Sequence, residues 1–194
     1  MNAGLHFVVA GDPAQLTGGY RYDARIVQAL RARGLPVDVT GLPGRFPHAD
    51  DAARQALHRA LASLPDRSIA VIDGLALGGL PEVAGAHARR LRLVALVHHP
   101  LADETGLEDC QRAAFLDSER AALAHMVRVI ATSRFTARRL ADYGVDAERI
   151  AVIDFCSTGP SVSEKPGAAS RRCSSSQMRS SDHCATSSSG GHCT

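Results

Sequence analysis

Two adjacent histidines that follow an apolar run are the residues of this chain most suited to chemistry. His98 and His99 come directly after the apolar residues 93–97 and before Pro100. An apolar run of this length is typical of a buried strand, and the first polar side chains beyond it reach the cleft at the strand end. We therefore expect one of the two imidazoles to contact a ligand. The alternative is a histidine that only caps local backbone groups.

A metal centre is a second chemical interpretation of the same segment. His98, His99, Asp103 and Glu104 are residue types that bind metal ions. Adjacent residues on an extended chain point in opposite directions, so this spacing does not bring the two imidazoles to one ion. We predict that the segment holds no metal.

A zinc site near the C-terminus would need a different set of ligands. The candidate ligands beyond residue 154 are Cys156, Cys173, Cys184, Cys193, His183 and His192. No pair of these cysteines has the C-x-x-C spacing that is typical of zinc sites. We expect no zinc there either.

A glycine pair near the N-terminus offers a site for an anion. Residues 11–19 join an apolar run to a helical pattern and end in Gly18 and Gly19. Backbone N–H groups of paired glycines can approach an anion near the positive end of a helix, and a diphosphate suits that geometry. The alternative is a simple turn. Tyr20, which follows, either faces the cleft or only starts the helix.

Several nucleotide-binding motifs are absent from the sequence. There is no Gly-x-Gly-x-x-Gly, and residues 37–40 do not end in the acid that would bind a nicotinamide ribose. This disfavours a dinucleotide oxidoreductase. Gly-x-x-x-x-Gly-Lys-Ser/Thr is also absent, and residues 1–154 contain no lysine, which excludes a P-loop nucleotidase.

The elements that position these residues are short apolar runs alternating with helical patterns. We predict strands at residues 5–10, 37–40, 69–72, 93–97, 129–131 and 150–153. We predict helices at residues 20–33, 50–64, 81–90, 113–127 and 133–143, the first ended by Gly34, the second capped by Asp50 and the last ended by Gly144. In the fourth helix, the core face is expected to consist of Ala113, Leu116, Leu123 and Val127.

This alternation predicts a Rossmann-like α/β fold. Short, continuously apolar strands are typical of a parallel sheet covered by helices on both faces, with right-handed crossovers. Ligands of such sheets bind beyond the carboxyl ends of the strands. The candidate site is therefore formed by residues 11–19, 73–80, 98–107 and 132–133.

Composition narrows the class of protein further. The chain has 22 Lys and Arg against 20 Asp and Glu, a net charge of +2, which gives no basic face for nucleic acid. Residues 1–154 contain one cysteine, Cys110. No stretch approaches the ~20 apolar residues of a membrane span, and the N-terminus does not resemble a signal peptide. We expect a cytoplasmic protein without a membrane span, and peripheral membrane association stays open.

The pattern changes after Asp154. Residues 155–194 are rich in serine and cysteine, and their apolar residues follow neither the helix nor the strand period. Such a segment cannot bury enough apolar surface to offset the entropy of ordering. We expect one domain at residues 1–154 and a disordered tail at 155–194, and we interpret the tail as a frameshifted terminus.

The order of the motifs resembles a known family. The chain is similar to the N-terminal domain of family 4 retaining glycosyltransferases of the GT-B fold. The resemblance extends over nearly all of residues 1–154 and rests on Gly-Gly-Tyr at 18–20, Val-His-His-Pro-Leu at 97–101, Ala-Thr-Ser-Arg-Phe-Thr at 131–136, Tyr-Gly-Val at 143–145 and Arg-Ile-Ala-Val-Ile at 149–153.

The resemblance implies roles for the candidate residues. Gly18 and Gly19 match the loop whose amides approach the donor diphosphate, and His98 matches the histidine that contacts the transferred sugar. Tyr20 and His99 would lie at the cleft. Ser133 would also lie at its rim, although its position fits a helix N-cap equally well.

The resemblance also implies which molecules the protein binds and that a donor domain is missing. In that family the N-terminal domain holds a sugar, lipid or small-molecule acceptor, and the C-terminal domain holds a nucleotide sugar, with no further cofactor. After Asp154 one expects Pro-Gly and a linker to the donor domain, but the sequence reads Phe155-Cys156-Ser157. We therefore expect a glycosyltransferase domain that is inactive alone. The alternative is a non-catalytic half-domain that binds a ligand or partner.

Overall fold

Six parallel strands form the sheet that positions the candidate site. The computed structural model describes residues 4–15 and 17–153. The strands are β1 (Leu5–Ala10), β2 (Val37–Leu42), β3 (Ile69–Asp73), β4 (Arg92–Val97), β5 (Arg128–Ala131) and β6 (Ile150–Val152). Their order in the sheet is β2-β1-β3-β4-β5-β6, and every neighbouring pair is parallel. The predicted Rossmann-like α/β fold is confirmed.

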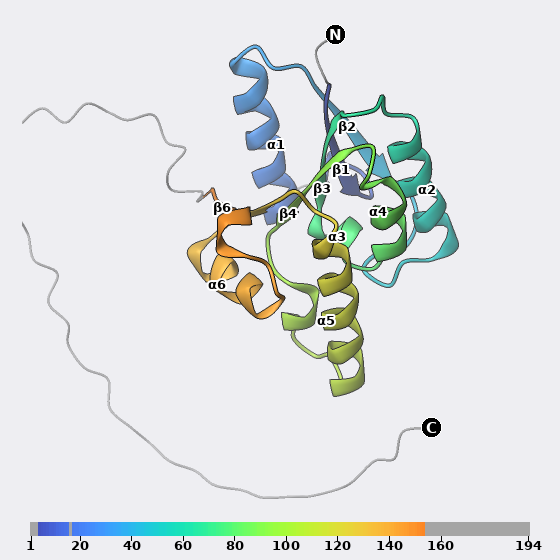
Figure 1. Ribbon diagram of the computed structural model, residues 1–194, viewed down its shortest axis with the longest axis vertical. Coiled ribbons are helices and arrows are strands. Elements are labelled where there is room, and N and C mark those ends of the chain that lie inside the picture. Colours follow the sequence, from blue (N-terminus) through green and yellow to red (C-terminus); the bar gives the residue numbers. More distant parts are fainter. Residues whose placement is uncertain (1–3, 16, 154–194) are drawn as a thin grey trace, which may run out of the picture. The chain divides into compact units, whose positions relative to one another are not determined.

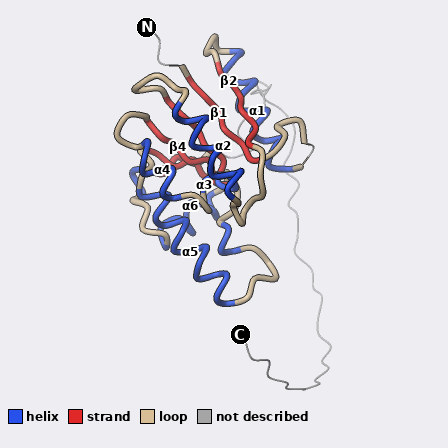
Figure 2. The backbone as a smooth tube through the Cα atoms, turned by 90° about the vertical axis from the view of Figure 1, so that its right-hand side faces the viewer, coloured by secondary structure: helices blue, strands red, loops and turns tan. Residues whose placement is uncertain are grey.

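Helices cover both faces of the sheet (Figure 1). They are α1 (Gly18–Ala32), α2 (Asp51–Ala62), α3 (Gly74–Leu77), α4 (Pro81–His87), α5 (Asp109–Ala124) and α6 (Arg134–Asp142), with 3-10 turns at Leu101–Asp103 and Ala147–Arg149. Viewed from the α2 side, Figure 2 shows α2 and α4 in front of the strands and α1 behind them.

Side chains that alternate along β1 separate two cores. Val8 and Ala10 belong to the larger one, which buries residues of α2, α4, α5 and α6. Phe7 and Val9 belong to the smaller one, which packs against Tyr22 and other residues of α1. Because both faces of β1 are covered by helices, residues 7–10 of this strand are all apolar, as parallel strands usually are.

The strand register brings the ends of the strands to one edge. Val8 pairs with Ile72, Asp73 with Leu96, and Val97 with Ala131. The segments that follow β1, β3, β4 and β5 therefore leave the sheet on the same side, which is where parallel sheets bind ligands.

The predicted capping residues of α1, α2 and α6 agree with the structure. The carboxylate of Asp50 caps α2 by accepting a hydrogen bond from Ala53 N at 2.9 Å. Gly34 and Gly144, just after the ends of α1 and α6, have φ angles of 78° and 75°, a region that favours glycine.

The predicted core face of α5 is wrong in part. The helix ends at Ala124, so Val127 lies outside it and is 40% exposed. Ala113 is also exposed, whereas Leu123 is buried as predicted. The buried face includes Phe115 and Glu119. A pattern search that counts only apolar residues misses a core position filled by a hydrogen-bonded carboxylate.

Other boundaries also differ from the prediction. Helix α4 ends at His87 rather than near residue 90. Helix α3 and the two 3-10 turns were not predicted, because segments of three or four residues are too short to show a period. The break at Asp154, the disordered tail at 155–194 and the cysteines of that tail lie outside the residues that the structure describes.

Candidate functional site

The carboxyl edge of the sheet contains a small cavity. It has a volume of about 180 Å³ and is formed by α1, the end of β3 and the loop after β4. Its lining includes Gly19, Tyr20, Asp23, Asp73, His98 and His99. A cavity of this size is smaller than the ~300 Å³ typical for a whole drug-sized ligand, so it suits one group of a ligand. A larger cavity of about 420 Å³ lies between α2 and α4, away from this edge.

His98 forms the centre of the cavity wall together with two buried carboxylates. Its Nε2 lies 2.9 Å from Oδ1 of Asp23. Asp23 is 4% exposed and Asp73 is 5% exposed. One ligand atom from each of the three residues lies within 4.8 Å of the others. The ring of Tyr22 meets the imidazole edge-on, with the ring centres 5.3 Å apart.

The electrostatics of this group raise the pKa values of Asp73 and His98. Burial, followed by the negative charge of Asp23, raises the pKa of Asp73 to about 6. Burial acts to lower the pKa of His98, but the hydrogen bond to Asp23 and the charges of Asp23 and Asp73 raise it overall. Shifted pKa values of adjacent groups in a cleft are typical of functional sites.

Tyr20 closes the cavity from α1 and is tied to the end of β1. Its hydroxyl donates a hydrogen bond to the carbonyl of Ala10. Burial raises its pKa, as do the charges of Asp73, Asp23 and Asp12. The phenol is therefore neutral at physiological pH, and its fixed orientation makes Tyr20 part of the wall.

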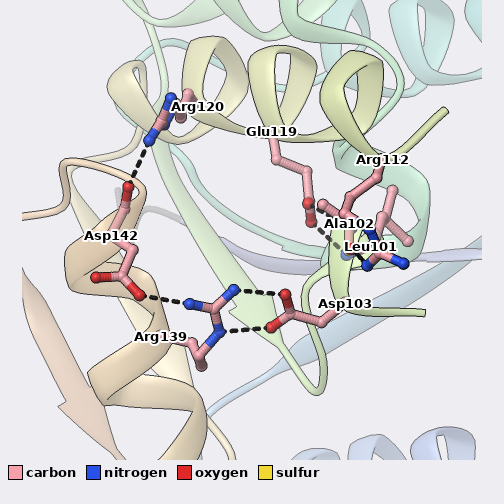
Figure 3. A network of polar contacts seen from close by, with 8 residues as sticks. All are labelled: Leu101, Ala102, Asp103, Arg112, Glu119, Arg120, Arg139 and Asp142. Carbon is pink, nitrogen blue, oxygen red and sulfur yellow. Dashed lines mark hydrogen bonds and ion pairs between the residues drawn. The ribbon is translucent and has the colours of Figure 1, made fainter. Parts of the chain in front are cut away.

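A polar network fixes the loop that follows His98 and His99 (Figure 3). Glu119 of α5 accepts hydrogen bonds from Leu101 N at 2.8 Å and Ala102 N at 3.2 Å. Arg139 of α6 binds both carboxylate oxygens of Asp103, at 2.8 and 2.6 Å. We use the name loop clamp for Glu119, Asp103 and Arg139 together with the two amides that donate hydrogen bonds to Glu119. It connects the loop after β4 to two helices and so holds the histidines at the cavity.

The residues after β5 hold the backbone of His98 in place by hydrogen bonds. The hydroxyls of Thr132 and Thr136 donate to the carbonyl of His98 at 3.3 and 3.1 Å. Ser133 is the N-cap of α6, and its Oγ accepts from Thr136 N at 3.0 Å. Residues 132–136 therefore position His98, and Ser133 is not among the residues that line the cavity.

The structure brings together four of the six candidate site residues. Gly19, Tyr20, His98 and His99 line the cavity, whereas Gly18 and Ser133 do not. A Cβ added at Gly19 would lie 3.6 Å from the His98 ring, and one added at Gly18 would meet nothing within 4 Å. Packing alone does not require glycine at either position. The roles given to these residues stay predictions.

The metal ligands suggested by spacing do not come together. Asp103 binds Arg139 in the loop clamp, and of the four suggested residues only His98 belongs to a three-ligand cluster within the described part of the chain. The group able to hold an ion is instead Asp23, Asp73 and His98. The prediction that the protein holds no metal stays open.

Sequence reasoning named neither aspartate, although Asp73 is the first residue of the predicted site segment 73–80. Asp73 ends an apolar run just as His98 does, so the same rule would have found it. Asp23 lies four residues before the buried Val27 on the same face of α1. An aspartate on the apolar face of a helix is a signal of a buried polar contact, and that signal was available in the sequence.

The protein has an α/β fold with a cavity at the carboxyl ends of a parallel sheet, the place where such folds usually bind ligands. The sequence profile described as Glycosyltransferase Family 4 matches residues 56–154, half of the chain. The chain belongs to this glycosyltransferase family. The matched region includes Asp73, His98 and the loop clamp. Comparison with curated proteins gives no match. Over residues 4–15 and 17–153, no helix has the length and apolar character needed to cross a bilayer.

Proposed function

We propose that this chain is the acceptor-side domain of a retaining glycosyltransferase that uses a nucleotide sugar. The observation that supports this most is that Gly19 and His98, from segments far apart in sequence, line one cavity at the carboxyl edge of the sheet. His98 contacts the transferred sugar in this proposal. The amides near Gly18 and Gly19 approach the donor diphosphate, while Tyr20 and His99 complete the cleft.

Transfer by this domain requires a second, donor-binding domain. A leaving diphosphate develops negative charge that cationic groups or amides must stabilise. The cavity lining contains no lysine or arginine. Backbone amides of one loop do not provide enough stabilisation, so we propose that the 194-residue chain is inactive alone and gains activity when joined to a donor domain. The acceptor is a sugar, lipid or small molecule, and no further cofactor takes part.

The test is a sugar-transfer assay on three proteins. The 194-residue chain, incubated with a panel of nucleotide sugars and acceptors, should give no transfer. The chain fused to the donor domain of another family member should transfer sugar with retained anomeric configuration, as read by NMR of the product. His98→Ala in the fused protein should lower kcat by about 100-fold, the typical effect of removing one stabilising donor.

The control is His6→Ala, which removes a histidine near the start of β1. The candidate site lies at the other end of the sheet, where the strands end. It should leave turnover unchanged. Transfer by the 194-residue chain alone would contradict the need for a donor domain. Equal turnover by the fused protein with and without His98→Ala would remove His98 from the mechanism. If the fused protein binds ligands without transferring sugar, the non-catalytic half-domain becomes the better interpretation.

A further inference from the structure

The hydrogen bond between His98 and Asp23 determines which ring nitrogen is available to a ligand. A carboxylate only accepts hydrogen bonds, so Nε2 must hold a proton to bind Asp23 at 2.9 Å. None of the residues that the structure describes forms a hydrogen bond with the other nitrogen, Nδ1. When the ring is neutral, Nδ1 accepts a hydrogen bond, and when the ring is protonated, Nδ1 donates one.

We infer that Asp23 is a positioning residue that fixes the tautomer and the charge of His98, so that Nδ1 is the nitrogen offered to the ligand. This inference rests on the proposed function for the identity of the ligand, a sugar hydroxyl. The geometric part rests on the structure alone. Asp23 comes from α1, four residues after Gly19, and its side chain lies between that helix and the imidazole.

Asp23 can act in this way because it is buried. A carboxylate exposed to water would be screened and would hold the imidazole weakly. Asp23 is 4% exposed, and the edge-on ring of Tyr22 packs against the same imidazole. These two contacts leave the ring little freedom to turn. Asp73 adds a second negative charge near the ring, which further favours the protonated form.

The titratable groups that line the cavity include more carboxyl groups than imidazoles. Asp23 and Tyr20 come from α1, Asp73 from β3, and His99 and Glu104 from the loop of His98 itself. The hydroxyls of Thr132 and Thr136 donate hydrogen bonds to the backbone carbonyl of His98. With three carboxyl groups and two imidazoles at its wall, the cavity favours a neutral, hydroxyl-bearing group over a phosphate.

The inference is tested by NMR of the 194-residue chain with isotope-labelled histidine. The chain has 9 histidines, and the signals of His98 are assigned by their loss in His98→Gln. The ring should be the Nε2–H tautomer when neutral, and its pKa should lie above the ordinary value of 6.5. Asp23→Asn should lower that pKa and mix the two tautomers. Asp73→Asn should lower the pKa less and leave the tautomer unchanged.

The matched control is Asp38→Asn. Asp38 also lies near a histidine, with 3.6 Å between its Oδ2 and Nδ1 of His6, but its side chain is 82% exposed and it lies on β2. This substitution should leave the His98 titration unchanged. Inorganic diphosphate, added as a probe, should perturb the His98 signals less than methyl α-glucoside at the same concentration. The reverse order would contradict the neutral-ligand assignment.

Two results would overturn the positioning role. One is an Nδ1–H tautomer in the parent chain, a measurement that needs no substitution. The other is a folded Asp23→Asn variant whose His98 titrates as in the parent. Neither measurement uses a donor domain or a transfer assay, so the positioning role and the proposed glycosyltransferase function can fail independently.

Discussion

The candidate site and the loop clamp lie at the same edge of the sheet and both contain buried carboxylates, but they use them differently. In the loop clamp, both oxygens of Glu119 accept hydrogen bonds from backbone N–H groups, and Asp103 binds an arginine. In the site, Asp23 and Asp73 lie beside each other, and of the two it is Asp23 that forms a hydrogen bond with the imidazole of His98. The clamp has a partner for each charged or polar group, whereas the site has two negative charges against at most one positive charge.

This difference separates a structural group from a functional one. The buried carboxylate of Glu119, bound by amides, and the partly buried carboxylate of Asp103, bound by a guanidinium, stabilise the native state because each has hydrogen-bond partners. Two buried carboxylates in contact repel each other, and a protein tolerates that repulsion where the charges serve a ligand or a reaction. We therefore expect substitutions in the two groups to have opposite effects on stability.

The largest effect should follow from Glu119→Ala. Two buried amides, Leu101 N and Ala102 N, would lose their acceptor, and a cavity would form beside Gly78. Hydrogen bonds to a charged group are each worth about 1.5–3 kcal/mol, so the free energy of unfolding should fall by about 3–5 kcal/mol. Urea denaturation at neutral pH measures this loss.

Glu119→Gln sharpens the same comparison. It keeps the size of the side chain and one acceptor, so it should lose about half as much stability as Glu119→Ala. The control is Asp117→Ala, an exposed residue on the same helix, which should have no measurable effect. If Glu119→Ala were as stable as the parent, the clamp would not be the structural group that we describe.

The fold could be predicted from the sequence far better than the site. The strands were found because their buried positions form short, mostly apolar runs, and Asp50 and Gly144 marked helix ends by known local chemistry. The register that brings Asp23 to His98 depends on how α1 packs on β1 and β3. No local pattern encodes that packing. The loop clamp was missed for the same reason, since Glu119 and Arg139 belong to different helices.

The next largest effect should follow from Asp73→Asn, which should raise the free energy of unfolding rather than lower it. Asp73 has a pKa of about 6 in the folded protein against the ordinary value of 3.8. The folded state therefore binds the proton more tightly, and stability is lost as pH rises from about 4 through about 6. A difference of about two pKa units corresponds to at most about 3 kcal/mol. The variant loses the attraction to His98, so we expect a net gain of about 1–3 kcal/mol at pH 7.

The pH dependence distinguishes this cause from a change in packing. The gain in Asp73→Asn should shrink to near zero by pH 4, where Asp73 of the folded parent is already protonated. Asparagine keeps the oxygen that accepts from Leu75 N, so the start of α3 should stay intact. Unfolding curves at pH 4, 6 and 8 provide the measurement. A gain of equal size at all three values would show that charge is not the cause.

The smallest effect should come from Arg139→Ala, which tests how much of the loop clamp depends on its ion pair. Arg139 is 35% exposed and Asp103 18%, so water screens the pair, and we expect a loss of about 1 kcal/mol at pH 7. The hydrogen bond and charge of Arg139 lower the pKa of Asp103. This contribution is therefore present above about pH 4, the ordinary range of an aspartate, and disappears as the pH falls through the lowered value. Arg138→Ala, an exposed arginine on the same helix, is the control and should show no change. A loss from Arg139→Ala as large as that from Glu119→Ala would mean that the exposed pair, rather than the buried carboxylate, holds the loop that contains His98.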